Sequence, residues 1–315
     1  MKIRKVMVVL TIILSIMVGC GKNNNIVKED AKNIGNYKII KHAFGDTKVK
    51  EFPNRVVVLE LGFIDPLVEM GIKPVGVADD KKPQLINQKI LKEIEGYKSV
   101  GRRAEPSLEM LKNIKPDLII ADASRHKNAY AELSKIAPTI ALKNVNASYQ
   151  DTIDATLTIG DAVGKVEQAK NIVKKHKEKV QQIKSKTTGT TPSILLMAER
   201  DGIFNTRTLQ FFTPGLLEAL GYKYALPDKS GDYSVKMTLD QLVQIDPEMI
   251  VLMKTVAGES SVAKLNKNSL WKNLRAVKNS RVYEVDVTSW SLRRSLEGAN
   301  QIIDEAGSLF FNFDK

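Results

Sequence analysis

Short apolar runs alternate with stretches of helical periodicity along most of the chain. In the first half the runs lie near residues 55–59, 74–78, 117–121 and 139–142, and in the second half near 193–198, 249–253 and 281–285. Apolar runs of this length, separated by helical patterns, are typical of buried strands in a parallel sheet. The pattern therefore predicts an α/β fold of two Rossmann-like lobes, each built on a mainly parallel sheet.

One segment of the chain occurs twice in weakly similar form, because residues 107–120 match residues 238–251. Each copy begins with a helix-capping residue, Ser107 or Thr238, and continues with apolar residues at helical spacing. Pro116 or Pro247 then stops the helix before an apolar run. Each copy is predicted to be a short helix followed by a buried strand, and the repetition supports two lobes.

A long segment, 149–187, separates the two halves. It contains no proline, its apolar residues keep a helical period, and its lysines take mostly the other faces. We expect one or two helices that join a lobe at 37–148 stiffly to a lobe at 188–315, in place of a flexible hinge. The alternative is a helix hairpin inside a single domain.

The N-terminus carries the pattern of an export signal. Basic residues at 2–5 precede an apolar run at 6–18 and then Gly19 and Cys20, the only cysteine. The run is shorter than the about 20 residues of a membrane-spanning helix. We expect a signal peptide at 1–19, lipidation of Cys20, a polar linker over 20–36, and a location on the extracytoplasmic face of the cell membrane. An uncleaved anchor is the alternative, and an internal disulfide is impossible with one cysteine.

The chain is basic, with a formal net charge of +12. Such an excess can serve nucleic acid, an anionic surface or an anionic ligand. Export and the lack of a patch that mixes basic and aromatic residues disfavour nucleic acid. Many of the lysines lie on predicted helix faces, where a solvated surface is the simpler interpretation.

Signatures of catalysis and of metal binding are missing from the sequence. It has no complete phosphate loop, no dinucleotide glycine fingerprint and no Gly-x-Ser-x-Gly elbow. The histidines, His42, His126 and His176, lack metal-ligand spacing. We expect His176 to be solvated on the lysine-rich helix and His42 to belong to an early hairpin or linker. No catalytic residue, cofactor or direct metal ligand is predicted, although an exported enzyme with a site built from distant residues stays an alternative.

Arginines follow several predicted strands, at Arg102, Arg103, Arg125, Arg200, Arg207, Arg293 and Arg294. Two-lobed α/β proteins bind ligands at the carboxyl ends of their strands, and the guanidinium fork suits carboxylate or phosphate. Together these arginines predict a binding site for a polyanion, although any single one could be a surface or salt-bridge residue. Aromatic residues that could wall the cleft are Tyr149, Phe204, Phe211, Phe212 and Trp290. Phe211 and Phe212 could equally be core, and we expect Trp290 to be partly exposed.

These residues resemble a known family, the helical-backbone (class III) substrate-binding proteins of ABC importers for iron-siderophores and cobalamin. The general marks are Arg-Val-Val-Val-Leu at 55–59, Gly-Ile-Lys-Pro-Val-Gly-Val at 71–77, Pro-Ser-Leu-Glu at 106–109 and Pro-Asp-Leu-Ile at 116–119. The chain is more similar still to the ferric-dicitrate-binding members. That likeness lies in the runs 58–65, 74–80, 98–102, 119–122, 125–126, 136–139 and 147–151, and more thinly at Arg200, 204–205, Trp290 and Arg294.

The resemblance implies a monomeric lipoprotein that binds iron(III)-dicitrate and delivers it to an ABC permease and its ATPase. The chelator would hold the iron, and the predicted ligand-binding residues are Arg102, Arg103, Arg125, Arg200, Arg207, Arg294, Trp290 and Tyr149. Glu109 and Glu218 are implied to dock on permease arginines, whereas from the sequence alone they could be ordinary exposed helix residues. Alternatives are a receptor for a hydroxamate or catecholate siderophore, and a plain adhesion or scaffold lipoprotein.

Overall fold

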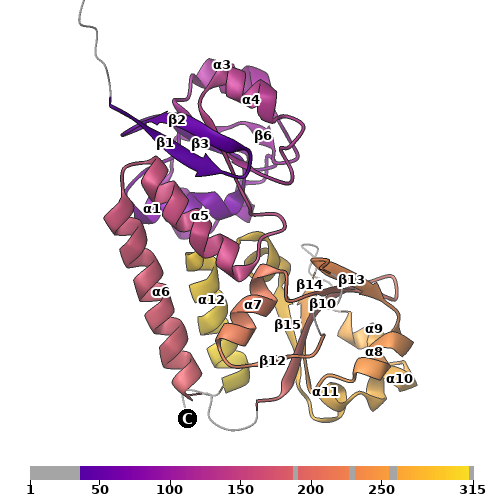
Figure 1. Cartoon of the computed structure of the whole chain (residues 1–315). Helices are drawn as coiled ribbons and strands as arrows, with labels where there is room; N and C mark the ends of the chain where they lie inside the picture. Colours follow the sequence, from indigo (N-terminus) through magenta and orange to yellow (C-terminus); the bar gives the residue numbers. More distant parts are fainter. Residues whose placement is uncertain (1–35, 187–190, 227–230, 255–260, 312–315) are drawn as a thin grey trace, which may run out of the picture. The chain divides into compact units, whose positions relative to one another are not determined.

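Two open sheets, one from each half of the chain, organise the computed structural model (Figure 1). The structure describes residues 36–186, 191–226, 231–254 and 261–311. The predicted signal peptide and Cys20 lie outside the described residues. Among the helices within these ranges, none is both long enough and apolar enough to cross a membrane.

The sheet of the N-terminal lobe is wholly parallel. Its strand order is β5 (Lys98–Ser99), β4 (Gly76–Val77), β3 (Val56–Val58), β8 (Leu118–Asp122) and β9 (Thr139–Leu142). Because side chains alternate between the faces of a strand, Val56 and Val58 enter one core while Val57 enters another. The helices of this lobe are α1 (Ile64–Glu69), α2 (Gln88–Glu93), α3 (Leu108–Ile114) and α4 (Tyr130–Ile136).

The remaining elements of the N-terminal lobe are short. Two antiparallel hairpins join β1 (Tyr37–His42) to β2 (Gly45–Lys50) and β6 (Gly101–Arg102) to β7 (Glu105–Pro106). The 3-10 turns are η1 (Leu61–Phe63) and η2 (Pro83–Leu85). His42 ends β1, which confirms its placement in an early hairpin.

The sheet of the C-terminal lobe is mixed. Its order is β13 (Ser234–Met237), β11 (Ile203–Arg207), β10 (Ser193–Arg200), β14 (Met249–Lys254) and β15 (Val282–Asp286), with β12 (Lys223–Tyr224) also beside β10. β10, β12, β14 and β15 are parallel, as predicted, whereas β11 and β13 pair antiparallel. β11 and β13 lacked a continuous apolar run, so periodicity did not reveal them.

Short helices surround the C-terminal sheet. They are α7 (Phe212–Ala219), α8 (Leu239–Ile245), α9 (Val262–Leu265), α10 (Ser269–Asn273), α11 (Arg275–Lys278) and α12 (Leu296–Ala306), with the short π-helices η3 (Thr288–Leu292) and η4 (Gly307–Phe311). The two-lobed α/β architecture that the sequence predicts is confirmed.

The repeated segment folds twice into the same unit. The Ser107 hydroxyl accepts a hydrogen bond from the Met110 amide, and the Thr238 hydroxyl accepts one from the Gln241 amide. Both helices end at a residue in the left-handed region, Lys115 or Asp246, directly before the proline. The prediction of a capped helix followed by a buried strand is therefore confirmed in both copies.

The segment between the lobes contains two helices, α5 (Tyr149–Ala162) and α6 (Val166–Lys186), which pack on each other. The chain turns at Gly164, whose φ of +71° suits glycine and whose missing side chain makes room for the Phe52 ring. α5 contacts both α1 and α7, and α6 packs on α12 (Figure 1). Helix-on-helix contacts thus connect the two lobes.

His176 in α6 is buried, so the expectation of a solvated side chain was wrong. Its ring lies on the inner face of the helix, where Nε2 meets the Tyr149 hydroxyl at 2.7 Å and Nδ1 meets Asn300 Oδ1 at 2.7 Å. Burial lowers the pKa of His176. The neighbouring lysines point to solvent, and they obscured this inward position in the sequence.

Candidate functional site

A cluster of charged side chains lies where the parallel strands of the N-terminal lobe end. Glu60 comes shortly after β3, Asp122 ends β8, Arg125 lies in the loop that follows, and Asn144 comes after β9. Arg103 directly follows β6. Carboxyl ends of parallel strands meet at one edge of a sheet, which is where open α/β folds place their ligands.

Asp122 holds the loops after β8 and β9 together. One carboxylate oxygen accepts from the backbone amides of Ser124 and Arg125, at 2.9 and 2.6 Å. The other accepts from the amides of Asn144 and Val145, at 2.7 and 2.9 Å. Hydrogen bonds to a carboxylate are strong, so the fully buried Asp122 fixes the start of both loops.

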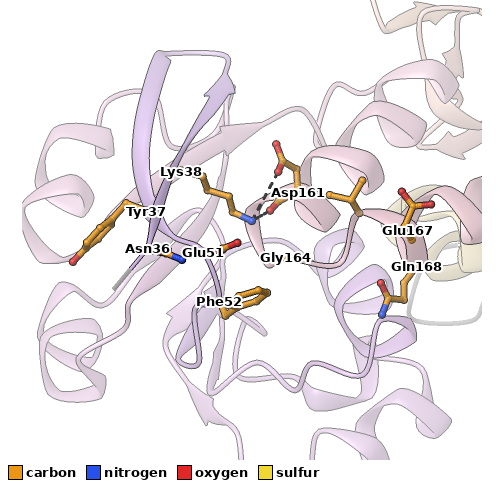
Figure 2. A pocket seen from close by; sticks show the side chains of 10 residues that line it. Asn36, Tyr37, Lys38, Glu51, Phe52, Asp161, Gly164, Glu167 and Gln168 are labelled. Carbon is orange, nitrogen blue, oxygen red and sulfur yellow. Dashed lines mark hydrogen bonds and ion pairs between the residues drawn. The ribbon is translucent and has the colours of Figure 1, made fainter. Parts of the chain in front are cut away.

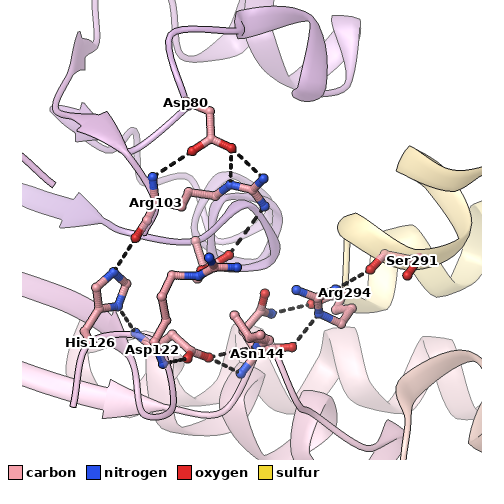
Figure 3. Close-up of polar contacts among 10 residues, drawn as sticks. Asp80, Arg103, Asp122, His126, Asn144, Ser291 and Arg294 are labelled. Carbon is pink, nitrogen blue, oxygen red and sulfur yellow. Dashed lines mark hydrogen bonds and ion pairs between the residues drawn. The ribbon is translucent and has the colours of Figure 1, made fainter. Parts of the chain in front are cut away.

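Arg103 is fixed at its backbone and at its side chain. His126 Nδ1 accepts from the Asp122 amide at 2.8 Å, so Nε2 carries the proton and donates to the Arg103 carbonyl at 2.7 Å (Figure 3). Burial lowers the pKa of His126, in keeping with a neutral ring. The Asp80 carboxylate accepts from the Arg103 amide at 2.7 Å, from Nε at 2.9 Å and from Nη2 at 2.6 Å.

Glu60 is a buried carboxylate between two arginines. Its side chain is 0% exposed, and one oxygen lies 3.6 Å from Nη1 of Arg103 while the other pairs with Nε of Arg125. Within the described part of the chain, neither oxygen has a hydrogen-bond partner. Burial raises the pKa of Glu60, and the positive charges of Arg125, Arg294 and Arg103 oppose that rise.

Arg294 brings the C-terminal lobe to the same place. Its Nε donates to the Asn144 carbonyl and its Nη1 to the Ser291 carbonyl, while Asn144 Nδ2 donates to the Arg294 carbonyl at 2.9 Å (Figure 3). Arg294 is buried, and desolvation lowers its pKa to about 10. The reciprocal contact with Asn144 joins the two lobes at the charged cluster.

Arg207 completes the C-terminal side of the cluster. Its Nη2 donates to the Ser291 hydroxyl at 3.3 Å, and its guanidinium lies 4.5 Å from the centre of the Phe211 ring. Arg294 lies 5.7 Å from the same ring centre. Burial lowers the pKa of Arg207, and the charges of Arg207 and Arg103 lower that of Arg294. We call Arg103, Arg125, Arg207 and Arg294 the arginine cluster.

The other predicted arginines point elsewhere. Arg102 is exposed on β6, and the Arg200 side chain is 89% exposed at the β10–β11 turn, beside Asp201. Arg293 donates to Gln301 at 3.2 Å. The structure thus groups four of the seven strand-end arginines, and a ligand-binding role for Arg102 or Arg200 stays a prediction.

The aromatic residues are mostly core. The expectation that Trp290 is partly exposed was wrong, because its ring is fully buried and its Nε1 donates to Glu305 at 2.7 Å. Phe204 and Phe212 are also buried, and Phe204 stacks on Trp271. Tyr149 is half-buried. Phe211 is buried yet lies under two arginines, so it serves both the core and the cluster.

Several residues that build the site had no role assigned from the sequence: Glu60, Asp80, Asp122, Asn144 and Ser291. Three of them are acidic residues that closely follow apolar runs. An acidic residue at the end of a predicted strand indicates the edge of a binding site as much as an arginine does. The strand-end arginines by themselves give no sign of these acids. The acids organise the arginines, so both signs of charge had to be considered together.

Cavities that the structure describes also lie away from the arginine cluster. One of about 610 Å³ lies between the first hairpin and the turn from α5 to α6 (Figure 2). Its wall carries Glu51, Asp161 and Glu167, and its one lysine, Lys38, already pairs with Asp161 at 3.8 Å. An anion would meet net negative charge there. Among the described residues, no group of three or more His, Cys, Asp or Glu side chains could hold a metal ion.

Comparison with known proteins shows the family of the chain. Residues 56–287 match the family model described as periplasmic binding protein. The chain belongs to this family. Periplasmic binding proteins carry ligands and do not transform them, which confirms the prediction that the chain is not an enzyme.

Relatives of this periplasmic binding protein include two from Bacillus subtilis (strain 168). One, named "Putative ABC transporter substrate-binding lipoprotein YhfQ", is 46% identical over 96% of this chain and 97% of that protein. The "Fe(3+)-citrate-binding protein YfmC" is 38% identical over 95% and 94% of the two chains. The "Fe(3+) dicitrate-binding periplasmic protein FecB" of Escherichia coli (strain K12) is 32% identical over 86% and 92%.

A solved structure shares the fold of this periplasmic binding protein. Staphylococcus aureus SirA, crystallised with staphyloferrin B, superposes with a TM-score of 0.76 at 27% identity, over 87% of this chain and 98% of that one. The predicted resemblance to substrate-binding proteins of ABC importers is thereby confirmed. The chelates in these names are carried ligands, in agreement with the prediction that the ligand is not a cofactor.

Proposed function

We propose that this protein is a lipid-anchored extracytoplasmic receptor that binds ferric citrate and passes it to an ABC permease driven by its ATPase. The observation that carries this proposal is the convergence of Arg103 and Arg125 from one lobe with Arg207 and Arg294 from the other. Four buried or half-buried guanidinium groups at one junction match an anion that is large enough to touch both lobes.

The chemistry of the chelate fits these side chains. Citrate oxygens complete the coordination of iron(III), so the protein needs to supply no thiolate or imidazole. Carboxylates that stay free of the iron present paired oxygens, and guanidinium groups bind such pairs through two parallel hydrogen bonds. The work of the protein is then to neutralise charge and to exclude other anions by shape.

The names of the relatives support the same ligand class. Two relatives at 38% and 32% identity are named for ferric citrate or ferric dicitrate, and SirA was crystallised with staphyloferrin B. The lipid at Cys20, the monomeric state and the lobe boundaries at 37–148, 149–187 and 188–315 belong to the proposal as predictions. A lipid tether would keep the receptor at a high effective concentration near its permease.

Calorimetric titration tests the ligand. Residues 36–315 form a compact unit of their own, so a lipid-free chain that begins at residue 21 is suitable. We expect tight binding of ferric citrate and weak binding of citrate without iron. Binding of a hydroxamate or catecholate chelate without binding of ferric citrate would show that the proposed ligand is wrong. Absence of binding by every ferric chelate would contradict the whole proposal.

Docking on the permease is proposed to use one exposed glutamate on each lobe. Glu109 lies in the first turn of α3 and Glu218 near the end of α7, and both are exposed. Charge reversal, Glu109→Arg with Glu218→Arg, should abolish iron uptake by cells while ligand affinity stays unchanged. Asp240 is a matched control, because it is exposed and occupies in α8 the position that Glu109 occupies in α3. Asp240→Arg should leave uptake intact.

A further inference from the structure

The carboxylate of Glu60 makes the contacts with arginines that an anionic ligand would otherwise make. It contacts Nη1 of Arg103 and Nε of Arg125, two arginines of the proposed chelate site. We infer, on the basis of the proposed function, that Glu60 is the internal counter-anion of the empty site and takes up a proton when the anionic chelate binds.

The contacts of Arg103 show why a bound anion would displace the carboxylate of Glu60 and not that of Asp80. Arg103 gives its Nε and Nη2 to Asp80, which leaves Nη1 on the side of Glu60. Asp80 also accepts from the Arg103 backbone amide, so its position is fixed from two directions. Glu60 holds its arginines only through ion pairs, and a ligand carboxylate can replace those contacts without disturbing the backbone.

The two buried acids of the cluster differ in their hydrogen bonds. Asp122 accepts hydrogen bonds from four backbone amides, which hold its carboxylate in place. Glu60 is equally buried, and in the described part of the chain neither of its oxygens accepts a hydrogen bond. Its charge therefore depends on the neighbouring guanidinium groups, and it is the group whose protonation a bound anion would change most.

Every charged group around Glu60 can be named from the structure. The positive groups are Arg103, Arg125 and Arg294, the negative group is Asp122, and Asp80 lies on the far side of Arg103. His126 is held with Nε2 protonated and Nδ1 accepting, in keeping with a neutral ring. Burial already raises the pKa of Glu60 against the pull of the arginines.

The sign of the coupling follows from these charges. An anion bound to the arginines weakens their hold on the Glu60 charge and adds repulsion, so the pKa of Glu60 rises further in the complex. The complex then binds more protons than the empty protein. By linkage, affinity for the chelate gains from falling pH between the pKa of Glu60 in the empty protein and its higher pKa in the complex.

Calorimetry in two buffers of different ionisation enthalpy measures this proton uptake. Ferric citrate is titrated into the lipid-free chain, into Glu60→Gln and into Asp117→Asn, across the range from pH 5 to pH 8. Asp117 is the control acid of the same lobe. Its carboxylate accepts hydrogen bonds from backbone amides at the opposite end of the same sheet, away from the arginine cluster. Wild type and Asp117→Asn should take up as much as about one proton more than Glu60→Gln, which should also bind more tightly at the highest pH.

The failures of the two proposals are distinguishable. Binding with equal proton uptake in wild type and Glu60→Gln would overturn the role of Glu60 and leave the proposed function standing. Absence of any ferric chelate binding by wild type would overturn both. Carboxyl ¹³C NMR of wild type with gallium(III) citrate, a diamagnetic substitute for the paramagnetic ferric chelate, gives an independent reading, since the Glu60 signal should titrate at a higher pH in the complex than in the empty protein. An unchanged titration would contradict the inference without the need for a variant.

Discussion

The two lobes hold their arginines in different ways. In the N-terminal lobe, Arg103 and Arg125 meet the carboxylates of Asp80 and Glu60. In the C-terminal lobe, the contacts of Arg294 and Arg207 are carbonyl oxygens, the Ser291 hydroxyl and the Phe211 ring. Neutral partners compensate a buried charge less fully than a carboxylate does, so the C-terminal arginines have more to gain from an incoming anion.

The internal repeat adds to this contrast. Its two copies share the helix and the strand but not the charged residue that ends the strand. α3 with β8 and α8 with β14 share their caps, their left-handed ends and their buried strands. At the end of β8 stands Asp122, which organises two loops, whereas the matching position in β14 is Met253. The polar site was therefore built separately in each lobe.

The largest expected effect is that of Arg294→Ala, which tests whether the C-terminal lobe supplies the dominant charge. Removal of a buried charge with its hydrogen bonds costs about 2–5 kcal/mol, so affinity for ferric citrate should fall by about 30-fold or more. Arg103→Ala should lose less, because its removal also frees the carboxylate of Asp80 to water. A greater loss for Arg103→Ala, measured by the same titration, would reverse the comparison.

A second variant breaks the join between the lobes without removing a charge. A Cβ at Gly62 would clash with the Arg294 carbonyl oxygen and with Nδ2 of Asn144, the pair that connects the lobes. Gly62→Ala should lower the free energy of unfolding by about 1–3 kcal/mol, as overpacking does. Thermal unfolding measures the loss, and Asn144→Ala, which removes one partner of the clash, should restore part of it in the double variant.

Sequence periodicity predicted the scaffold well because buried strands and capped helices are local features. The runs at 117–121 and 249–253 became β8 and β14, and the caps Ser107 and Thr238 were recognisable from single residues. The arginine cluster was only partly predictable. Arg103 directly follows β6, and Arg200 is the last residue of β10. Asp80, in a left-handed turn, draws Arg103 inward, whereas Arg200 lies at an exposed hairpin turn. Such differences depend on partners far away in sequence, which no local pattern contains.

The next effect concerns pH and a second hydrogen bond between the lobes. The buried Asp65 of α1 accepts a hydrogen bond from the Ser295 hydroxyl that begins α12, so here too a carboxylate of the N-terminal lobe meets a neutral group. Burial raises the pKa of Asp65 from 3.8 to about 6. The folded protein therefore binds this proton more tightly than the unfolded chain does. Its contribution is complete below pH 3.8 and is lost as the pH rises to about 6.

The size of this pH effect is bounded by the shift in pKa, at about 3 kcal/mol between pH 4 and pH 6. Asp65→Asn keeps an oxygen that can accept from Ser295 and removes the titration. Chemical unfolding at several pH values should show a flatter profile for the variant, with a higher stability than wild type at pH 7. A profile that stays as steep in the variant would assign the pH dependence to other groups.

The smallest effect is expected for Arg200, which tests the comparison within one lobe. Its side chain is 89% exposed beside Asp201, and exposed ion pairs contribute about 0–1 kcal/mol. Arg200→Ala should therefore change the affinity for ferric citrate by about fivefold at most. Arg207, seven residues further on, is half-buried over Phe211, and Arg207→Ala should weaken binding much more. A large loss for Arg200→Ala in the same titration would mean that the chelate reaches the β10–β11 turn, and that the C-terminal lobe offers exposed as well as buried charge.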